Sequence, residues 1–379
     1  MTRRLFPLAL LLLLPLLLLL TPGKAQAREV GTSAKACVVI DAKSGRVLLE
    51  HNADVSLPMA STTKVMTALL AIERGNLQDL VTCGRNAFGV PGTSIYLSQG
   101  ETLTLEQMLY GLLMASGNDA AVAIAEHIGG TVDDFCRMMT ERAAALGCTG
   151  TVFLTPHGLP RDGHYTTAHD LALIAREAMT HDIFRTIVST RRAKIPWEGR
   201  AYDRVLNNKN KLLATYEGAT GIKTGFTRAA GRCLVFGAKR GGMEVIGVVL
   251  CCGDWFDEAA RLMDTAFAEW ENVTLLNAGE HIRTLPVSGA DGATVDAELS
   301  CDLTGLVPMG ALPRLEIDLP DGLTSPVRAG ETLGEARMTV KGETMAASPL
   351  VASADALRDD FPARFRNWQR LWLLLPADP

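Results

Sequence analysis

The stretch PMASTTKVMTALLAIE (residues 58–73) places a serine and a lysine three positions apart at the start of a run of helix-forming residues. The positive end of the helix macrodipole favours Asp or Glu in the first turn, by about 0.3–1 kcal/mol per charge. Lys64 has the opposite charge, at a position where a capping box would have Glu or Gln. Because such violations of a local rule are expected at functional sites, Ser61 and Lys64 are candidates for chemistry. Residues three apart on a helix lie on one face, so the two side chains are expected to be neighbours.

Outward from this stretch, helical segments are enclosed by two strand-like blocks. ACVVIDAKSGRVLLE (residues 36–50) has the pattern of a β-hairpin that turns at residues 43–45. After residue 218 come GIKTGFT and then RCLVFGAKR and MEVIGVVLCC, which predict a second hairpin turning at Gly241-Gly242. Helical periodicity marks residues 61–74, 105–115, 119–128, 133–146, 168–180 and 254–270. We therefore predict an α+β domain over residues 28–272, an antiparallel sheet with a helical insert.

The chain beyond residue 272 has a different pattern. HIRTLPV, TVDAELS, RLEIDLP and RMTVKGETM are short strand-like runs separated by Gly and Pro, which predict a small β-sandwich over residues 273–352. The last segment contains FPARFRNWQRLWLLL, in which apolar residues share one helical face and the arginines lie largely off it. We expect residues 353–379 to form an amphipathic helix on a membrane surface, with docking on the β domain as the alternative.

The first 27 residues have the features of a secretory signal peptide. Arg3 and Arg4 precede an apolar run over residues 5–20, and AQA (residues 25–27) matches a small-x-small cleavage site. An uncleaved membrane anchor is the alternative, although the apolar run is short for a membrane span. The sequence thus predicts an exported protein at the outer face of the cytoplasmic membrane or in the cell wall.

Composition and charge narrow the class of function. Lys and Arg number 37 against 42 Asp and Glu, and removal of residues 1–27 takes away further positive charge. An acidic exported chain is a poor candidate for binding nucleic acid. The eight cysteines lie mostly in apolar or helical runs, so we expect mainly buried free thiols. The sequence has no CxxC or HExxH motif, and the spacing of His164, His169 and Asp170 fits no zinc pattern.

Three short motifs of hydroxyl, amine and amide side chains follow one another along the chain. They are Ser61-x-x-Lys64, Ser116-Gly117-Asn118 and Lys223-Thr224-Gly225. Each motif alone has a structural explanation, as a helix cap or a solvated strand lysine. Together they are more specific, because the first lies at a helix start, the second between two helices and the third on a strand. A glycine on that strand would let a substrate backbone approach closely.

This set of motifs resembles the SxxK, SxN and KTG signature of the active-site serine penicillin-recognising enzymes. More closely, the chain resembles the low-molecular-weight penicillin-binding proteins that are D-alanyl-D-alanine carboxypeptidases. IDAKSGRVL, SGNDAAVAIAE, TPHGLPRDGHYTTAHDLALIA, NKNKLL and GIKTGFTRAAG match in kind, and the likeness covers about residues 33–272. It implies a penicillin-binding transpeptidase/β-lactamase-like fold. Phe226 stands where some members have His, and the loop glutamate motif of class A β-lactamases is missing.

The resemblance implies acyl transfer on the D-Ala-D-Ala end of peptidoglycan pentapeptide stems. Ser61 would attack the carbonyl of the penultimate D-Ala with Lys64 as general base. Ser116 would relay a proton to the leaving amine, and Asn118 would hold the substrate amide. β-Lactams would acylate Ser61 and act as inhibitors. No metal or organic cofactor is expected.

The same resemblance assigns the strand motif to substrate binding. Lys223 and Thr224 would bind the terminal carboxylate of the substrate. Gly225 would allow close approach, and the N–H groups of Ser61 and Phe226 would form the oxyanion hole.

The implied chemistry explains why a lysine begins the helix. A base that accepts a proton from serine needs a pKa near the working pH rather than about 10.4. Lowering that pKa by about 3 requires about 4 kcal/mol of bias against the charged form, more than a helix end supplies. We expect burial of Lys64 and a second cation, Lys223, to supply most of it.

Other functions are compatible with the same motifs. A β-lactamase or a DD-endopeptidase on the same scaffold is one alternative. A non-catalytic penicillin-binding or sensor module is another, although an abandoned site should have lost Ser61 or a lysine. A zinc carboxypeptidase would act on the same substrate but would be inactivated by chelators.

Overall fold

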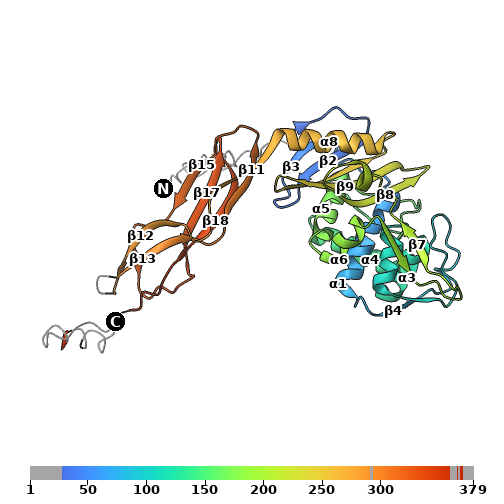
Figure 1. Ribbon diagram of the computed structural model, residues 1–379, viewed down its shortest axis with the longest axis horizontal. Coiled ribbons are helices and arrows are strands. Elements are labelled where there is room, and N and C mark those ends of the chain that lie inside the picture. Colours follow the sequence, from blue (N-terminus) through green and yellow to red (C-terminus); the bar gives the residue numbers. More distant parts are fainter. Residues whose placement is uncertain (1–27, 291–292, 359–364, 366–367, 370–379) are drawn as a thin grey trace, which may run out of the picture. The chain divides into compact units, whose positions relative to one another are not determined.

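The computed structural model describes residues 28–290, 293–358, 365 and 368–369. This part of the chain divides into two compact units, which we call the large unit (residues 28–271) and the β unit (residues 272–358) (Figure 1). None of the helices in the described residues is long and apolar enough to cross a membrane. The predicted signal peptide, residues 1–27, lies outside the described residues.

A six-stranded sheet forms the centre of the large unit, with the strand order β1-β3-β2-β10-β9-β8. Its strands are β1 Arg28–Glu29, β2 Ala36–Asp41, β3 Val47–His51, β8 Ala219–Thr227, β9 Gly231–Arg240 and β10 Met243–Leu250. All neighbours pair antiparallel except β1 with β3. Both predicted hairpins, β2–β3 and β9–β10, are confirmed. The pairing of β2 with β10 joins the two strand blocks of the sequence into one sheet.

Helices cover both faces of this sheet (Figure 1). α8, Trp255–Glu269, packs on β9 and β10 from one side, and α5, Ala168–Ala178, packs on β2 and β10 from the other. The remaining helices are η1 Ala60–Thr63, α1 Lys64–Arg74, α2 Leu105–Leu113, α3 Asn118–Gly129, α4 Val132–Ala145, α6 Asp182–Ser189 and α7 Leu212–Thr215. The sequence pattern predicts all of these except α6 and α7.

α1 lies in the interior of the helical layer, where it contacts α2, α3, α4 and α5. Its residues 64–71 are all buried, which is typical of a helix enclosed by other elements on every side. Packing from all directions therefore fixes the side chains of its first turn, including Lys64.

Two short ribbons complete the large unit. β4 (Leu80–Thr82) pairs with β5 (Thr102–Thr104), and β6 (Arg192–Ile195) pairs with β7 (Arg204–Asn207). The sequence does not predict these ribbons, because strands this short show too few alternations of apolar and polar residues.

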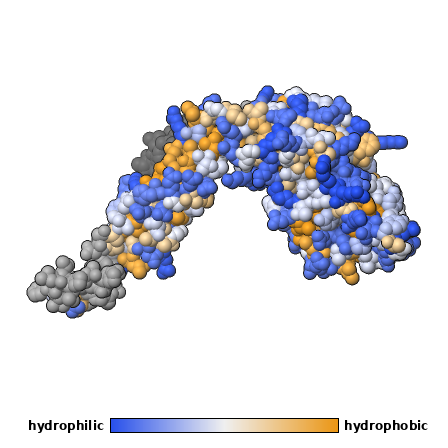
Figure 2. All heavy atoms as spheres, viewed as in Figure 1, coloured by the Kyte–Doolittle hydropathy of each residue, from blue (hydrophilic) through white to orange (hydrophobic). Residues whose placement is uncertain are grey.

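The β unit contains strands and no helix within residues 272–358, in agreement with the sequence. Its larger sheet has the order β15-β17-β18-β13-β12-β16, and β11 pairs with β14. The strands are β11 Trp270–Leu276, β12 His281–Ser288, β13 Thr294–Leu299, β14 Leu303–Pro308, β15 Arg314–Asp318, β16 Leu323–Thr324, β17 Thr332–Val340 and β18 Glu343–Ala352. Figure 2 shows polar and apolar residues mixed on the visible surface of this unit.

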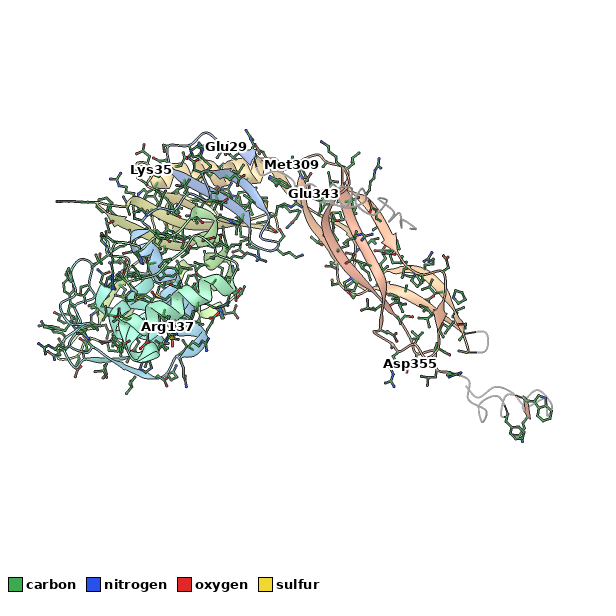
Figure 3. All side chains as sticks on the ribbon, turned by 180° about the vertical axis from the view of Figure 1, so that it is seen from behind. Glu29, Lys35, Arg137, Met309, Glu343 and Asp355 are labelled. Carbon is green, nitrogen blue, oxygen red and sulfur yellow. The ribbon has the colours of Figure 1, made fainter. Side chains whose placement is uncertain are left out.

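The helix predicted over residues 353–379 is wrong for its first part. Ala356 forms a β-bridge with Val327 through two backbone hydrogen bonds of 2.9 Å. Asp355, labelled in Figure 3, accepts a hydrogen bond from the N–H of Ala329 at 2.7 Å. These bonds to the β unit replace the local bonds that a helix would make. The rest of the predicted helix, apart from residues 365 and 368–369, lies outside the described residues.

All eight cysteines are free thiols, and six of them are buried. Cys251 is partly buried and Cys301 is exposed. Burial raises the pKa of Cys37 and of Cys233 to about 12. The expectation of mainly buried free thiols is therefore confirmed. Buried thiols that stay protonated are also unreactive.

Candidate active site

Ser61 lies on a short 3-10 turn, η1, and the α-helix begins only at Lys64. Ala60, immediately before Ser61, has a φ of +49°, a left-handed conformation that is uncommon for a residue with a Cβ. No side-chain cap hydrogen bond forms at the start of η1 or α1, so Ser61 is not a helix cap. Unusual backbone conformations of this kind cluster at functional sites.

Lys64 is fully buried and contacts three polar groups at once. Its Nζ lies 3.0 Å from Ser61 Oγ, 2.8 Å from Asn118 Oδ1 and 2.8 Å from the carbonyl oxygen of His157. The ammonium form donates to all three groups. The neutral form still donates to the two carbonyl oxygens and accepts the proton of Ser61. The same positions therefore serve both protonation states, as a general base requires.

The pKa of Lys64 is well below its usual value. Burial is the main cause, the positive charges of Lys223 and Lys209 add to it, and Asp119 opposes it. The expected effect of Lys223 is therefore present, and Lys209 has an effect that the sequence did not predict. A lysine that loses its charge more easily can take the proton of Ser61.

Ser116-Gly117-Asn118 connects α2 to α3. Ser116 is buried, with a φ of +65°, and lines the same cavity as Ser61. Asn118 is the first residue of α3, and its Nδ2 donates to the carbonyl oxygen of Pro91 at 2.6 Å while its Oδ1 accepts from Lys64. Asn118 thus holds Lys64 and the loop around Pro91 in fixed positions.

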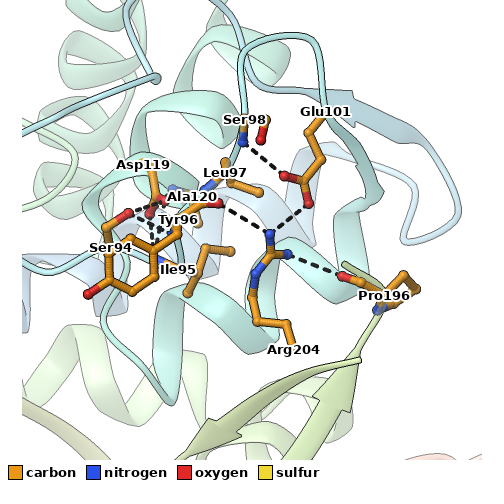
Figure 4. A network of polar contacts seen from close by, with 10 residues as sticks. All are labelled: Ser94, Ile95, Tyr96, Leu97, Ser98, Glu101, Asp119, Ala120, Pro196 and Arg204. Atoms are coloured by element: carbon orange, nitrogen blue, oxygen red, sulfur yellow. Dashed lines mark hydrogen bonds and ion pairs between the residues drawn. The ribbon is translucent and has the colours of Figure 1, made fainter. Parts of the chain in front are cut away.

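Asp119 orders the loop that precedes β5 (Figure 4). Its buried carboxylate accepts hydrogen bonds from the N–H groups of Ile95 and Leu97, each at 3.1 Å, and from the hydroxyl of Ser94 at 2.5 Å. Hydrogen bonds to a carboxylate are strong, so Asp119 keeps residues 94–97 next to the start of α3.

A buried ion pair connects the same loop to the β6–β7 ribbon (Figure 4). Arg204 Nη2 lies 2.8 Å from Glu101 Oε1, with side chains only 4% and 0% exposed. Arg204 Nη1 also donates to the carbonyl oxygen of Pro196 at 3.2 Å. Sequence reasoning missed this pair, because its members are 103 residues apart and neither belongs to a motif.

The third motif lies on β8, an edge strand that packs against η1. Lys223 is buried, and its Nζ donates to the carbonyl oxygen of Thr224 at 2.9 Å. Burial, and then the charge of Lys209, lowers the pKa of Lys223 to about 7. Phe226 is 61% exposed at the end of the motif.

Gly225 allows β8 to approach the turn that carries Ser61. A Cβ at this position would lie 2.9 Å from the backbone nitrogen of Ser61 and 3.0 Å from that of Thr62. Contacts this short are essentially absent from proteins, so any side chain here would push β8 and η1 apart. The close approach that the sequence suggests for a substrate is thus made by the protein's own backbone.

A cavity of about 730 Å³ joins the three motifs. The predicted residues that line it are Ser61, Ser116, Thr224, Gly225 and Phe226. The predicted residues that are almost fully buried are Lys64, Asn118 and Lys223. Hydrogen bonds and charge link this buried group to the residues of the wall. The structure therefore brings all eight predicted residues to one place.

Lys209 is a residue of the site that the motifs did not identify. It lies before α7, lines the cavity, and has its Nζ 3.4 Å from Thr93 Oγ1. Its charge lowers the pKa of both Lys64 and Lys223. The stretch NKNKLL, which contains Lys209, was the available signal.

Among the described residues, one group of side chains has ligand atoms close enough together for a metal ion: Glu73, Glu177 and His181. Arg142 already bridges the two carboxylates, with Nη2 2.6 Å from Glu73 and 2.7 Å from Glu177. Because the guanidinium neutralises both acids, we interpret this group as an ion-pair cluster.

Comparison with known proteins finds similarity over both units. A family model described as D-alanyl-D-alanine carboxypeptidase matches residues 23–252, and one described as penicillin-binding protein 5, C-terminal domain, matches residues 270–357. The D-alanyl-D-alanine carboxypeptidase DacF of Bacillus subtilis is 32% identical over 88% of this chain and 88% of its own length. DacA of Escherichia coli, with the same description, is 31% identical over 89% and 87% of the two chains.

Solved structures agree with these matches. Penicillin binding protein 5 from Haemophilus influenzae has a TM-score of 0.73 and 28% identity, and the match covers 87% of this chain and 99% of that one. The fold is therefore the mixed α/β fold of penicillin-binding proteins, followed by a C-terminal β domain.

Proposed function

Because this chain belongs to the D-alanyl-D-alanine carboxypeptidase family, we propose that Ser61 is its nucleophile. Ser61 forms an acyl-enzyme with the penultimate D-Ala of peptidoglycan pentapeptide stems and releases the terminal D-Ala. The observation that carries this proposal is the 3.0 Å contact between Lys64 Nζ and Ser61 Oγ, made inside a buried site. The lowered pKa of Lys64 supports its role as the base.

Acylation moves one proton through Lys64. Lys64 takes the proton of Ser61 Oγ while Oγ bonds to the carbonyl carbon of the penultimate D-Ala. The N–H groups of Ser61 and Phe226 bind the oxyanion, and one such donor is worth about 3–4 kcal/mol. The C–N bond then breaks as the leaving nitrogen receives the proton from Lys64 through the hydroxyl of Ser116. Both serines are on the cavity wall, which supports these roles.

Substrate selection depends on the cations around β8. Thr224 on the cavity wall and the buried Lys223 bind the terminal carboxylate of the substrate, and Lys209 adds positive charge on the same cavity. The enzyme therefore requires a free C-terminal carboxylate. Asn118 hydrogen-bonds Lys64 and also holds the substrate amide.

Hydrolysis of the acyl-enzyme completes the reaction. Water attacks the ester carbonyl, the bond to Ser61 Oγ breaks, and the oxygen regains its proton. A β-lactam acylates Ser61 in the same way, but its opened ring keeps the leaving group attached in the path of the water. The β-lactam acyl-enzyme therefore lasts longer than the natural one.

Release of D-alanine from an acyl-Lys-D-Ala-D-Ala peptide tests the proposal. Residues 28–379 should release D-alanine in the presence of EDTA, and penicillin or Ser61→Ala should abolish the release. No release, with penicillin still labelling Ser61, would contradict the proposal and indicate a sensor. Rapid nitrocefin turnover would indicate a β-lactamase, and cleavage of cross-linked muropeptides an endopeptidase.

We also propose that residues 1–27 direct export and that the segment after Arg358 binds the membrane surface. The charged and apolar patterns of the two segments support this. Fractionation of cells that express a version ending at Arg358, which keeps the bridge between Ala356 and Val327, tests the second part. Unchanged membrane association, with the signal peptide cleaved, would contradict it.

A further inference from the structure

His164 is a buried histidine in the large unit whose two ring nitrogens both have partners. It is 6% exposed, and Nδ1 accepts a hydrogen bond from the N–H of Leu154 at 3.0 Å. Nε2 lies 2.9 Å from Oγ1 of Thr63, a residue of the turn that carries Ser61. The two partners are ten and 101 residues away along the chain, so the imidazole joins distant segments.

The direction of these hydrogen bonds follows from their donors. Because Nδ1 accepts from a backbone N–H, it carries no proton, and the neutral ring must carry its proton on Nε2. Nε2–H then donates to Thr63 Oγ1, and the Thr63 hydroxyl donates its own proton to the carbonyl oxygen of Ala60 at 2.8 Å. The chain of bonds ends on the residue with the left-handed φ of +49°, directly before Ser61.

The loop over residues 154–164 also reaches the other side of the catalytic pair. The carbonyl oxygen of His157, at its tip, accepts from Lys64 Nζ, and that of Pro156 accepts from Thr67 Oγ1 at 2.6 Å. A Cβ at Gly158 would lie only 1.8 Å from the carbonyl oxygen of Ala60, so the loop backbone presses directly against the turn. One loop therefore contacts both the base and the turn of the nucleophile.

We propose that His164 is a positioning residue for acyl transfer, which holds the Ala60–Ser61 turn and the 154–164 loop in register so that Ser61 Oγ stays within reach of Lys64 Nζ. This inference rests on the proposed role of Ser61. His164 does not line the cavity, and its ring nitrogens bond Thr63 and Leu154 rather than Ser61, so it acts through Thr63 and Ala60.

Burial keeps His164 in the form that this role needs. It lowers the pKa of His164 to about 4, with a smaller effect from the charge of Arg161. The ring is therefore neutral near pH 7 and keeps Nδ1 free to accept the N–H of Leu154.

The experiment compares Thr63→Val with Thr63→Ser and with a control, Thr166→Val. Thr166 is fully buried like Thr63 and bonds Thr151 Oγ1 at 2.8 Å, but it has no bond to the turn of the nucleophile. We measure kcat and KM for D-alanine release, the rate of Ser61 acylation by a fluorescent penicillin, and the melting temperature. Thr63→Val should lower kcat and the acylation rate by about 10²-fold with KM within twofold, since small misplacements of reacting groups cost about that much. Thr63→Ser keeps the hydroxyl and should retain most of the rate.

A second pair of variants tests the imidazole itself. In His164→Gln the side-chain amide can reach Thr63, whereas in His164→Asn it can replace only the contact of Nδ1 with Leu154. The acylation rate and kcat of His164→Gln should therefore be higher than those of His164→Asn, at similar melting temperatures.

A purely structural role would give other results. The inference is overturned if Thr63→Val keeps the full acylation rate, or if the rates of all variants, including Thr166→Val, simply follow their melting temperatures. The proposed function can fail separately. In that case the unmodified protein is acylated by penicillin without releasing D-alanine, and the acylation rates still test His164.

Discussion

The large unit and the β unit bury different kinds of polar side chains. In the large unit these include ionisable residues of both signs and a neutral histidine: Lys64, Glu101, Asp119, His164, Asp170, Arg204 and Lys223. In the described part of the β unit, the buried polar residues are the hydroxyl residues Ser325, Thr339 and Ser348. Burial of a charge costs several kcal/mol unless partners compensate it.

Buried ionisable side chains, which carry this energetic cost, are therefore found in the large unit. Lys64 and Lys223 belong to the site, and Asp119 fixes residues 94–97 next to it. Asp170 instead accepts hydrogen bonds from Gly150 and Thr151. The core of the β unit consists of apolar residues such as Leu299, Met338 and Leu350. Substitution of buried polar residues should therefore affect activity and stability strongly in the large unit and only weakly in the β unit.

Lys64→Met should produce the largest effect, because it removes the base while nearly keeping the side-chain volume. We expect kcat/KM for D-alanine release to fall by about 10²–10⁴-fold, the usual contribution of a general base. Lys239→Met, at an exposed position of β9, is the matched control and should leave kcat/KM for D-alanine release unchanged. A Lys64→Met variant with more than a tenth of the normal activity would exclude Lys64 as the base.

Arg204→Met should have the next largest effect, this time on stability. It leaves Glu101 as an unpaired buried charge, so the free energy of unfolding should fall by about 3–5 kcal/mol. Adding Glu101→Gln removes that charge and should recover part of the loss. Denaturant unfolding of the three proteins measures both changes. Equal stability of the single and double variants would show that the charge of Glu101 is not the cause.

The pH dependence of kcat/KM should change in Lys223→Gln. Without this neighbouring cation the charged form of Lys64 is favoured, so the pKa of Lys64 rises. Lys64 must be neutral to act as the base, and the acid limb of the profile should therefore move to higher pH. In the unmodified enzyme kcat/KM should also decline as pH rises through the Lys223 pKa of about 7, because substrate binding needs the charged form.

The two limbs are measured as kcat/KM for D-alanine release between pH 4 and 10 in buffers of equal ionic strength. Lys209→Gln should shift the acid limb in the same direction by less. An acid limb that stays in place in Lys223→Gln would mean that Lys223 does not act on the base.

Ser348→Ala should have the smallest effect of the four. Its hydroxyl donates to the carbonyl oxygen of Cys301 at 2.8 Å, and loss of one such bond should cost about 1 kcal/mol in the unfolding of the β unit. Calorimetry of the full chain measures this change, and kcat should be unaltered. A clear loss of kcat would contradict the distinction between the two units, because it would show that the β unit affects catalysis.

The sequence predicts those parts of the molecule that depend on short-range patterns. Ser61 and Lys64 are three residues apart, and the β2–β3 and β9–β10 hairpins follow from alternation around a turn. The motifs carry the resemblance that identifies the site. In each case the signal lies within a few residues, where spacing determines which side chains meet.

The parts that the sequence does not predict depend on contacts between distant residues. Arg204 and Glu101 are 103 residues apart, and His164 and Thr63 are 101 apart, so no local pattern connects them. The predicted helix is wrong at residues 353–358 for the same reason, because the bonds of Ala356 to Val327 are non-local and leave no local sequence pattern. Long-range packing and buried hydrogen bonds override local preference at these positions.

Gly225 has a consequence for the evolution of drug resistance. Any side chain at this position would meet the backbone of Ser61 and Thr62, so a substitution of Gly225 would displace the turn of the nucleophile together with β8. A substitution of Gly225 that weakens acylation by a β-lactam is therefore expected to weaken the reaction with the natural substrate as well. Phe226, the next residue, is 61% exposed and has room to change, so selection can alter the cavity there without moving the turn.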